Sequence, residues 1–414
     1  MPKVAIIGAG PGGLTLARLL QQNQIPCTIY ESETGRDVRN QGGTLDLHPK
    51  AGQLALKEAG LLDEFKKHAR PEGECSKILK YDGTVLCDEN EMGSGHRAEE
   101  DSDRPEIDRS RLRDLLMDSL KPGTIQWNKP LLRVDADARS RGIPRSREKY
   151  NLHFTDGSIE EDIDLVVGAD GAWSKVRPLV TDEKPFYPGI TIVELWALNV
   201  EEKYPWLSKF VGNGSCFMFD EGRAVICQRN GEHNGSIRVY AGLRKPETWA
   251  DDCGIDWADP KATEVLVKEY FNDCGEDIKR ALLECRDELV IRKTFMLPVG
   301  VTWESRPGVT LIGDAAHLMT PFAGVGVNLA MADALELANA LIARRDSFVA
   351  KAFSDSHNIS VAIKQYESGM FVRGKQNAEK TWKNMQGHFS AGGGEERAAR
   401  LQGQYERKKA AGLV

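Results

Sequence analysis

Apolar residues follow two different patterns along this chain, and the difference divides it into two kinds of structure. Short unbroken apolar runs at Lys3–Gly8, 164–168 and 309–312 each lead into a glycine-containing turn. Such runs are typical of parallel strands that are buried on both faces. The first run is followed by an amphipathic stretch, Leu14–Gln22, and by another apolar run, Cys27–Tyr30. This order predicts strand, glycine turn, helix and strand.

Between about residues 180 and 300, strand-like runs are separated by Asn, Gly and Asp turns. We expect an antiparallel sheet here, followed by helices at Ala262–Phe271 and Glu276–Cys285. The expected strands are Pro188–Val200, Ser215–Phe219, Arg223–Arg229 and Ser236–Arg244. Successive side chains of a strand face opposite ways, so only some of Trp196 and Phe217–Phe219 can line a site.

Helical spacing of apolar residues returns at Val327–Arg344 and again at Val361–Phe389. We expect the second helix to brace the two regions from outside. After a run of glycines, Glu395–Ala411 is highly charged, with Leu401 and Tyr405 as its few core anchors. This segment is interpreted as a surface helix, with a frayed tail as the alternative.

Charge and composition exclude several classes of protein. The chain has 414 residues, enough for two domains, and a net charge of −7, which disfavours a nucleic-acid partner. The basic stretch at 139–147 lies among Ser, Gly and Pro and is interpreted as a solvated hairpin loop. The eight cysteines form no C-x-x-C pair, so we expect reduced thiols and no metal site. No apolar run reaches the ~18–20 residues of a membrane span, and we expect a cytoplasmic protein.

Three glycines after the first strand have the spacing Gly-x-Gly-x-x-Gly. Gly8 permits the tight turn, Gly10 lets the backbone approach a pyrophosphate, and Gly13 lets the helix lie close to the strand. Free N–H groups at the helix N-terminus favour the phosphate charge. Glu31, after the second strand, can accept both ribose hydroxyls and would repel a 2′-phosphate. The site predicts FAD or NAD rather than NADP.

A second cofactor segment lies far downstream. Asp314 ends a strand and can bind a ribityl hydroxyl, and the backbone of Gly324–Val327 can bring N–H donors to the pyrimidine edge of a flavin. An NAD dehydrogenase has no need for such a return to the cofactor. Between the two segments, Asp164–Arg177 contains a further buried strand that ends in Ala169-Asp170-Gly171. These segments together favour FAD.

The three segments resemble the motifs of the group A flavoprotein monooxygenases, which have the p-hydroxybenzoate hydroxylase-like fold. Asp164–Arg177 resembles the DG motif of that family, and Gly313–Pro321 resembles its GD motif. Gly42–His48, Pro105–Arg109 and Tyr366–Gly374 look like the TetX-type tetracycline-inactivating monooxygenases. The resemblance extends over most of the chain.

The resemblance implies an α/β fold, with a Rossmann-like FAD-binding domain, an antiparallel-sheet substrate domain and a C-terminal bracing helix. The expected boundaries place 1–80, 106–180 and 301–345 in the FAD-binding domain, 81–105 and 181–300 in the substrate domain, and 346–414 in the C-terminal helix and tail.

The resemblance also implies an activity. NADPH or NADH would reduce FAD, O2 would form a C4a-hydroperoxide, and oxygen would pass to a small aromatic or polyketide-like substrate. The sequence has no separate NADPH-binding unit, so the donor would bind transiently, with Arg39 as its contact and the neighbouring Arg36 as the alternative. A monomer is expected. A flavin dehydrogenase or reductase on the same scaffold is the alternative. A flavin halogenase would need a Trp-x-Trp-x-Ile-Pro segment, which is absent, and a non-catalytic flavin-bound interaction module is the last hypothesis.

The expected cofactor contacts come from all of these segments. Arg109 could hold a phosphate or ribose by charge-assisted bonds, or form a surface ion pair with Asp108 or Glu106. The full set is Gly8, Gly10, Gly13, Glu31, Arg39, Gly43, Leu45, Asp46, Arg109, Asp170, Asp314, Pro321, Gly324, Val325, Gly326, Val327 and Asn328.

Trp196, Ser215 and Phe217 are the candidate substrate contacts. In the tetracycline-inactivating enzymes an arginine holds the substrate near the position of Ser215. The serine here argues against tetracycline as the natural substrate, and leaves a tetracycline-like substrate and tetracycline turnover as a side activity open. The oxygen-transfer chemistry belongs to the cofactor. His48 and His317 are therefore interpreted as packing and hydrogen-bonding residues, and no catalytic side chain is assigned.

Overall fold

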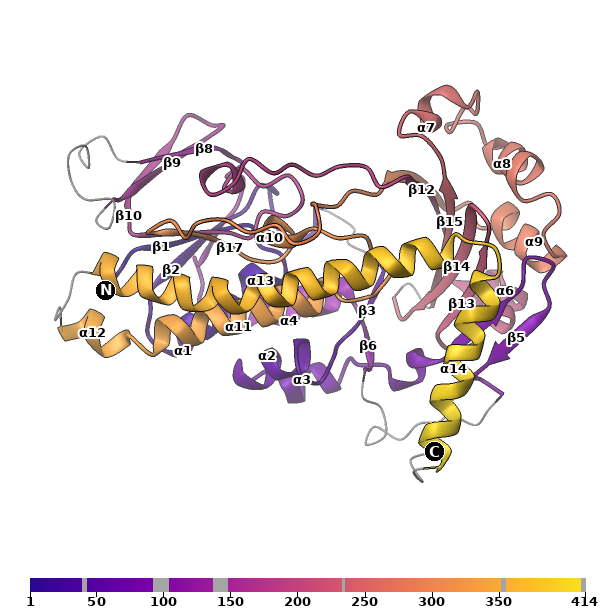
Figure 1. Ribbon diagram of the computed structural model, residues 1–414, viewed down its shortest axis with the longest axis horizontal. Coiled ribbons are helices and arrows are strands. Elements are labelled where there is room, and N and C mark those ends of the chain that lie inside the picture. The colour runs from indigo at the N-terminus through magenta and orange to yellow at the C-terminus, as the bar shows by residue number, and fades with distance from the viewer. Residues whose placement is uncertain (39–42, 92–103, 137–147, 233–234, 351–354, 411–414) are drawn as a thin grey trace.

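The computed structural model describes residues 1–38, 43–91, 104–136, 148–232, 235–350 and 355–410. Figure 1 shows a parallel sheet at one end of the molecule and an antiparallel sheet at the other, with the long helix α13 (Asp355–His388) extending along both. This arrangement agrees with the expected α/β fold. Arg39 and the basic stretch 139–147 lie outside the described residues.

The first region is built on five parallel strands in the order β17-β11-β1-β2-β7. The strand bounds are Val309–Leu311 (β17), Leu165–Gly168 (β11), Val4–Ile7 (β1), Cys27–Tyr30 (β2) and Ile125–Gln126 (β7). β1 is central because all four of its residues are apolar and buried. Ile7 is in register with Gly168, and Gly168 with Leu311. The turns that follow these three strands therefore meet at one edge of the sheet.

Helices cover one face of the parallel sheet, and a small antiparallel sheet, in the order β10-β9-β8, lies over the other (Figure 1). α1 packs on α11, and α11 also contacts α2 and α13. The bounds of the helices here are Pro11–Gln22 (α1), Gly52–Glu58 (α2), Leu62–Lys66 (α3), Arg109–Asp118 (α4), Asp314–His317 (α10), Gly326–Ile342 (α11) and Arg345–Ala350 (α12). The remaining strands are Thr44–Asp46 (β3), Glu106–Asp108 (β6), Leu131–Ala136 (β8), Tyr150–Phe154 (β9) and Ile159–Ile163 (β10).

The second region is a seven-stranded sheet in the order β16-β12-β15-β14-β13-β4-β5. The strand bounds are Glu288–Lys293 (β16), Ile190–Leu198 (β12), Ser236–Arg244 (β15), Arg223–Asn230 (β14), Ser215–Asp220 (β13), Ser76–Leu79 (β4) and Val85–Asp88 (β5). Its strands are antiparallel except that β4 runs parallel to β13. β4 thus belongs to this sheet, although it lies within the range 1–80 that the sequence assigned to the FAD-binding domain. The chain crosses between the regions before Ser76.

One face of the seven-stranded sheet, here called the outer face, is covered by short helices over an apolar core that includes Val193, Val239 and Leu266. The helices of this region are Val200–Lys203 (α5), Pro205–Val211 (α6), Trp249–Asp252 (α7), Ala262–Tyr270 (α8) and Glu276–Glu284 (α9). Short 3-10 helices at Pro71–Glu74 and Arg177–Leu179 lie in the connections between regions. The other face, the inner face, is directed toward the parallel-sheet region.

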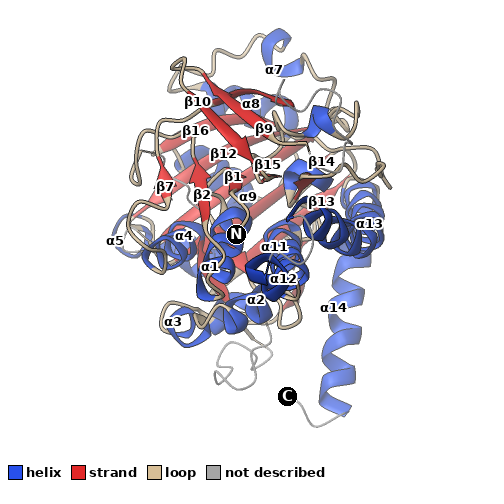
Figure 2. Ribbon diagram, turned by 90° about the vertical axis from the view of Figure 1, so that its left-hand side faces the viewer, coloured by secondary structure: helices blue, strands red, loops and turns tan. Residues whose placement is uncertain are grey.

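Two helices end the described chain. α13 begins at Asp355, earlier than the expected Val361. α14 (Gly393–Ala410) is a helix in the segment interpreted from the sequence as a surface helix, with a frayed tail as the alternative. α14 contacts β13, β4 and β5, and its far end projects from the body of the molecule (Figure 2). In the part of the chain that the structure describes, no helix combines the length and apolar character that a membrane span needs.

Candidate functional site: a flavin site facing a sheet

The glycine turn after β1 is shaped by two glycines that cannot carry a side chain. Gly8 has φ +106°, and a Cβ there would lie 2.4 Å from the carbonyl oxygen of Ala169. A Cβ on Gly13 would lie 2.2 Å from the carbonyl oxygen of Gly8. Gly10 is different, because a Cβ there would meet no described atom within 4 Å. Gly8 and Gly13 therefore allow the turn to close, and Gly10 leaves open the space that a pyrophosphate would need.

The carboxylate of Glu31 is held in place at the end of β2. Its Oε2 accepts the N–H of Ala9 at 2.6 Å, and its Oε1 accepts the N–H of Glu33 at 2.9 Å. The side chain is buried. The expected ribose acceptor thus lies beside the glycine turn, as the spacing of the motif predicts.

Arg177 joins the turn after β11 to the turn after β17. Its guanidinium donates to the carbonyl oxygens of Ala315 (2.8 Å), Asp314 (2.9 Å) and Ala172 (2.9 Å). Only 4% of the residue is exposed, and this burial lowers the pKa of the guanidinium. The sequence reasoning did not select Arg177, although it ends the Asp164–Arg177 segment, and an arginine within an otherwise apolar, glycine-rich motif was the available signal.

Two carboxylates lie at this joint. Asp170 Oδ2 accepts the N–H of Lys175 at 2.7 Å, whereas its buried Oδ1 has no hydrogen-bond partner among the described residues. Burial raises the pKa of Asp170. Burial among protein atoms also raises the pKa of Asp314, against the positive charges of His317, Arg109 and Arg177, although the residue itself is exposed to solvent. Asp314 is therefore accessible to solvent, although protein atoms surround it closely.

The segment around β3 is fastened to the start of α11 by Asn328. Asn328 Nδ2 donates to the carbonyl oxygen of Asp46 at 2.8 Å, and its Oδ1 accepts the N–H groups of His48 (2.8 Å) and Gly52 (3.2 Å). A Cβ on Gly324, which has φ +62°, would lie 3.3 Å from Asp46 Oδ1. The predicted residues of the two segments thus lie together, and the Asn328 side chain is used for this joint.

The remaining predicted cofactor residues belong to the same segments. Leu45 lies in β3 between Thr44 and Asp46. Pro321 accepts the N–H of Gly324 through its carbonyl oxygen at 3.1 Å, Val325 precedes α11, and Gly326 and Val327 open that helix. A Cβ on Gly326 would meet no described atom within 4 Å.

Gly43 and Arg109 connect the flavin side to the seven-stranded sheet. The N–H of Arg109 donates to the carbonyl oxygen of Gly43 at 2.9 Å. A Cβ on Gly43 would lie 3.0 Å from Arg238 Nη1. The charge of Arg109 also lowers the pKa of Tyr240, which burial raises overall. Both residues therefore lie where the two regions face each other.

The inner face of the sheet is an ordered set of rows across the strands. Residues in register on neighbouring strands share a face. One row contains Trp196, Arg238, Gln228 and Ser215; the next contains Glu194, Tyr240, Ile226 and Phe217; the third contains Ile192, Gly242, Ala224 and Phe219. The three candidate substrate residues, Trp196, Ser215 and Phe217, thus share the inner face.

The three candidates differ in accessibility. Trp196 is 2% exposed, because the Arg238 guanidinium lies 3.8 Å from the centre of its ring. Ser215 is buried, and its N–H donates to the carbonyl oxygen of Cys75. Phe217 is half-buried and stacks on Phe219 with ring centres 5.7 Å apart. Phe217 is therefore the candidate with surface available to a ligand.

A charged cluster on the inner face escaped the sequence reasoning. Glu194 is fully buried, its Oε1 lies 3.1 Å from Arg238 Nη1, and its Oε2 accepts Arg292 Nε. Trp196 Nε1 also donates to Glu194 Oε1 at 3.2 Å. The available signal was a single acid in the apolar strand Ile190–Leu198, because a buried carboxylate requires partners.

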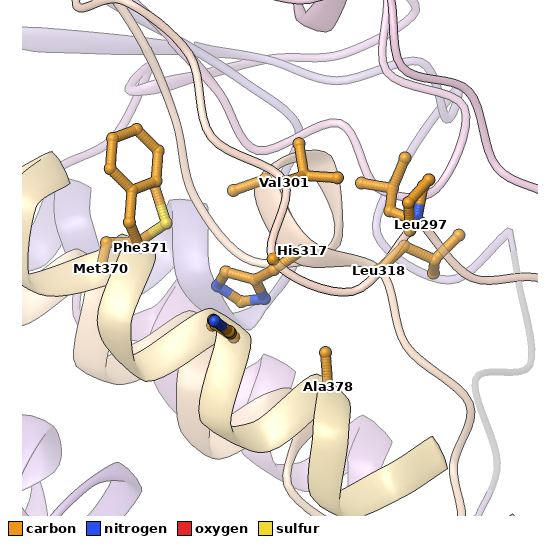
Figure 3. A pocket seen from close by; sticks show the side chains of 12 residues that line it. Leu297, Val301, His317, Leu318, Met370, Phe371 and Ala378 are labelled. Atoms are coloured by element: carbon orange, nitrogen blue, oxygen red, sulfur yellow. The ribbon is translucent and has the colours of Figure 1, made fainter.

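His317 belongs to a buried ion network separate from the hydrogen bonds of Arg177 and Asn328. Its Nε2 lies 2.6 Å from Asp333 Oδ2, and Asp333 Oδ1 accepts Arg373 at 2.7 Å. Asp333 Oδ2 also accepts the N–H of Gly313 at 2.9 Å, so the network holds the turn after β17. Figure 3 shows His317 facing the small cavity between α13 and the chain near Leu297. That cavity measures about 10 Å³, room for about one water molecule, so it is no substrate site.

Comparison with known proteins identifies the family. A family model described as FAD binding domain matches residues 1–346. The monooxygenase asqM of Emericella nidulans is 33% identical, over 94% of this chain and 96% of the relative. The monooxygenase penA of Penicillium thymicola is 31% identical, over 95% and 97%. The chain belongs to the FAD-dependent monooxygenases.

Further relatives of this FAD-dependent monooxygenase extend the comparison. The 3-amino-4-hydroxybenzoate 2-monooxygenase PtnB3 of Streptomyces platensis is 28% identical, over 82% of this chain and 79% of the relative. The structure of Klebsiella pneumoniae HpxO with FAD and uric acid has a TM-score of 0.70 at 20% identity, covering 98% and 93%. That of the tetracycline destructase Tet(55) has a TM-score of 0.70 at 18% identity, covering 97% and 95%. These two structures share the fold.

The residues of this monooxygenase fit FAD. Open space at Gly10 can receive the pyrophosphate, and the partnerless Oδ1 of Asp170 is a buried acceptor beside the glycine turn. Among the described residues, no group of three or more His, Cys, Asp or Glu side chains is placed to hold a metal ion.

Proposed function

We propose that this monooxygenase uses NADPH or NADH and O2 to hydroxylate a small aromatic or polyketide-like molecule. The observation that carries the proposal is the approach of the flavin-side residue Gly43 to Arg238 on the inner face of the sheet. When bound, FAD supplies the chemistry by accepting a hydride from the donor and activating O2. The chain supplies binding, orientation and exclusion of water.

Each side of the site has a separate task in this proposal. Gly10 and the N-terminus of α1 would receive the pyrophosphate, Glu31 the ribose, and Asp314 the ribityl chain. Gly324–Val327 would direct N–H donors toward the flavin ring, where reduced flavin carries negative charge. Arg39, which lies outside the described residues, remains the proposed contact of the nicotinamide donor. A monomer would suffice, since both sides of the site come from one chain.

The inner face supports a planar substrate. Phe217, Ile226 and Ile192 are partly exposed there and form the apolar part of its surface. The aromatic acid in the name of the PtnB3 relative and the uric acid bound to HpxO are both planar molecules. Apolar side chains with a few oriented polar groups are the common composition of small-molecule sites.

The test is product analysis with the FAD-loaded protein. Aromatic and polyketide-type compounds are screened for faster NADPH and NADH oxidation, and products are weighed by mass spectrometry. A gain of one oxygen atom supports hydroxylation. Turnover without oxygen insertion, sustained anaerobically by an artificial acceptor, would instead identify a flavin dehydrogenase or reductase.

A further inference from the structure

A stack of three rings, here called the wall, lies where the end of α13 meets the inner face. Phe219 lies between Phe217, with ring centres 5.7 Å apart, and His388, with ring centres 4.1 Å apart and planes 11° apart. Burial, together with the charges of Arg397 and Arg400, lowers the pKa of His388 to about 4, so its imidazole is neutral at pH 7. Its buried Nδ1 has no hydrogen-bond partner in the described chain. The wall is therefore aromatic and uncharged.

Arg397, in the second turn of α14, lies next to this wall. Its neighbour Ala398 is buried against Ile78 and Cys87, with Phe217 and Leu401 packed on the same cluster. Burial lowers the pKa of Arg397, as do the positive charges of Arg400 and Arg104, whereas the negative charge of Glu89 raises it. Glu89 is in the row of Ser215, because its carboxylate accepts the N–H of Ser76 at 2.9 Å and Ser76 is in register with Ser215. These neighbours place Arg397 at the inner face, near the half-buried Phe217.

Arg397 differs from the other arginines with a buried, partnerless Nε. Five described arginines have such an atom, namely Arg113, Arg238, Arg345, Arg373 and Arg397. Four of them form ion pairs through their terminal nitrogens, with Glu33, Glu194, Asp346 and Asp333 respectively. Arg397 forms no ion pair within 4.0 Å of any acid in the described residues. Burial is the largest influence on the pKa of its guanidinium, which it lowers.

A partly buried guanidinium without a counter-ion is costly to the folded protein unless a ligand neutralises it. We propose that Arg397 binds an anionic oxygen group, such as a carboxylate, of a planar substrate that lies against Phe217 and His388, the partly exposed rings of the wall. The guanidinium offers a fork of donors that matches a carboxylate in charge and shape. This inference rests on the proposed function in taking the bound molecule to be the substrate, but its binding requires no turnover.

The test measures binding, so that it is independent of oxygen transfer. The probes are benzoate, salicylate, 4-hydroxybenzoate, 3-amino-4-hydroxybenzoate and 1-naphthoate, each paired with its methyl ester. Dissociation constants come from the change in flavin absorbance of the FAD-loaded protein and from calorimetry. Arg397→Met is compared with Arg407→Met, which removes the same charge from an exposed position of the same helix.

The wild-type protein is expected to bind at least one acid more tightly than its ester. Arg397→Met should weaken that acid by roughly 10- to 100-fold, as expected for charge-assisted hydrogen bonds of ~1.5–3 kcal/mol, and change the ester by less than about twofold. Arg407→Met should leave both unchanged. Without ligand, Arg397→Met should melt no lower than wild type, because the arginine forms no ion pair with the described residues and its burial is unfavourable. Lower affinity in a folded variant can then be attributed to loss of the contact between Arg397 and the acid.

The proposal is overturned if no acid binds wild type more tightly than its ester, or if Arg397→Met weakens acid and ester alike. Loss of folding in Arg397→Met would also contradict it, because that result would show a structural partner for Arg397. The proposed function can fail separately. Acids that bind through Arg397 without gaining oxygen would contradict hydroxylation alone, and acids bound and hydroxylated equally well by wild type and Arg397→Met would contradict this inference alone.

Discussion

The flavin side of this monooxygenase and the inner face of its seven-stranded sheet satisfy their buried polar groups to different degrees. On the flavin side, Arg177 donates to four carbonyl oxygens and Asn328 uses both ends of its amide, whereas Asp170 Oδ1 has no partner among the described residues. On the inner face, by contrast, the buried Nε of Arg238, Nε of Arg397 and Nδ1 of His388 have no partners in the described residues.

The difference follows from what each side must do. A site that receives one fixed cofactor can have its turns held rigidly by internal hydrogen bonds, as at Arg177. A surface that recognises a separate molecule needs polar groups that the protein itself does not satisfy, because those groups are then free for the ligand. Substitutions on the flavin side should therefore affect folding and FAD together. Those on the inner face should affect substrate with little loss of either.

The largest effect is expected at Arg177. Arg177→Met would leave four carbonyl oxygens without their charged donor, which we expect to lower the free energy of unfolding by roughly 4 kcal/mol and to reduce FAD content strongly. Denaturant unfolding and the flavin-to-protein absorbance ratio measure the two quantities. Arg133→Met, at an exposed pair with Asp135, is the control and should change both little. Full FAD content in Arg177→Met would contradict the role of Arg177 in holding the turns after β11 and β17 at the FAD site.

Asp333→Asn tests the network behind the GD turn and should cost about 3 kcal/mol. Burial lowers the pKa of His317, but Asp333 outweighs it, so the pKa is raised; the pKa of Asp333 is lowered by His317 and Arg373 against burial. The stabilisation from His317 is complete below about pH 6.5 and is lost as pH rises through its folded pKa. That from Asp333 is present above about pH 4 and is lost as pH falls through its folded pKa.

The difference in unfolding free energy between wild type and Asp333→Asn should therefore be greatest between about pH 4 and 6.5 and decrease on both sides. Denaturant titrations across this range measure it. Asp346→Asn, at a fully exposed carboxylate, should give a small difference at every pH. A constant gap for Asp333→Asn would show that the network does not titrate as described.

Two glycine substitutions distinguish residues that allow the turn to close from residues that leave space for the cofactor. Gly13→Ala places a Cβ 2.2 Å from the Gly8 oxygen and should cost about 2 kcal/mol even without FAD. Gly10→Ala meets open space, so the FAD-free protein should keep its stability while FAD affinity falls. Unfolding of the FAD-free variants and fluorescence titration with FAD distinguish the two. Equal stability losses would contradict an open space at Gly10.

The smallest effect is expected on the inner face. Phe217→Leu removes a half-buried ring and should cost about 1 kcal/mol, raise KM severalfold and leave FAD affinity unchanged. Met218→Leu, on the outer face of the same strand, is the matched control and should leave KM unchanged. If both variants changed KM equally, the inner face would not be the substrate side.

Local patterns were sufficient where a site is built from consecutive residues. The Gly8–Gly13 turn, Glu31 after β2, and the ends of β11 and β17 could all be predicted, because strand, turn and helix signals there are contiguous. Arg177 and Glu194 were missed, because their importance depends on partners far along the chain. Trp196 could be assigned to a strand, but its cover by Arg238 depends on the register of β12 and β15.

The sequence by itself determined that this protein is an α/β flavoprotein with an N-terminal glycine turn, a returning GD segment and an antiparallel sheet. Periodicity and turn chemistry act over a few residues, so they can be read along the chain. Only the tertiary structure decided which side chains face one another across the site. It placed Arg177 on the carbonyls of two distant turns, Glu194 between two arginines, and Arg397 of α14 near Phe217 with no counter-ion among the described residues. Such pairings depend on packing between segments hundreds of residues apart, which no local pattern specifies.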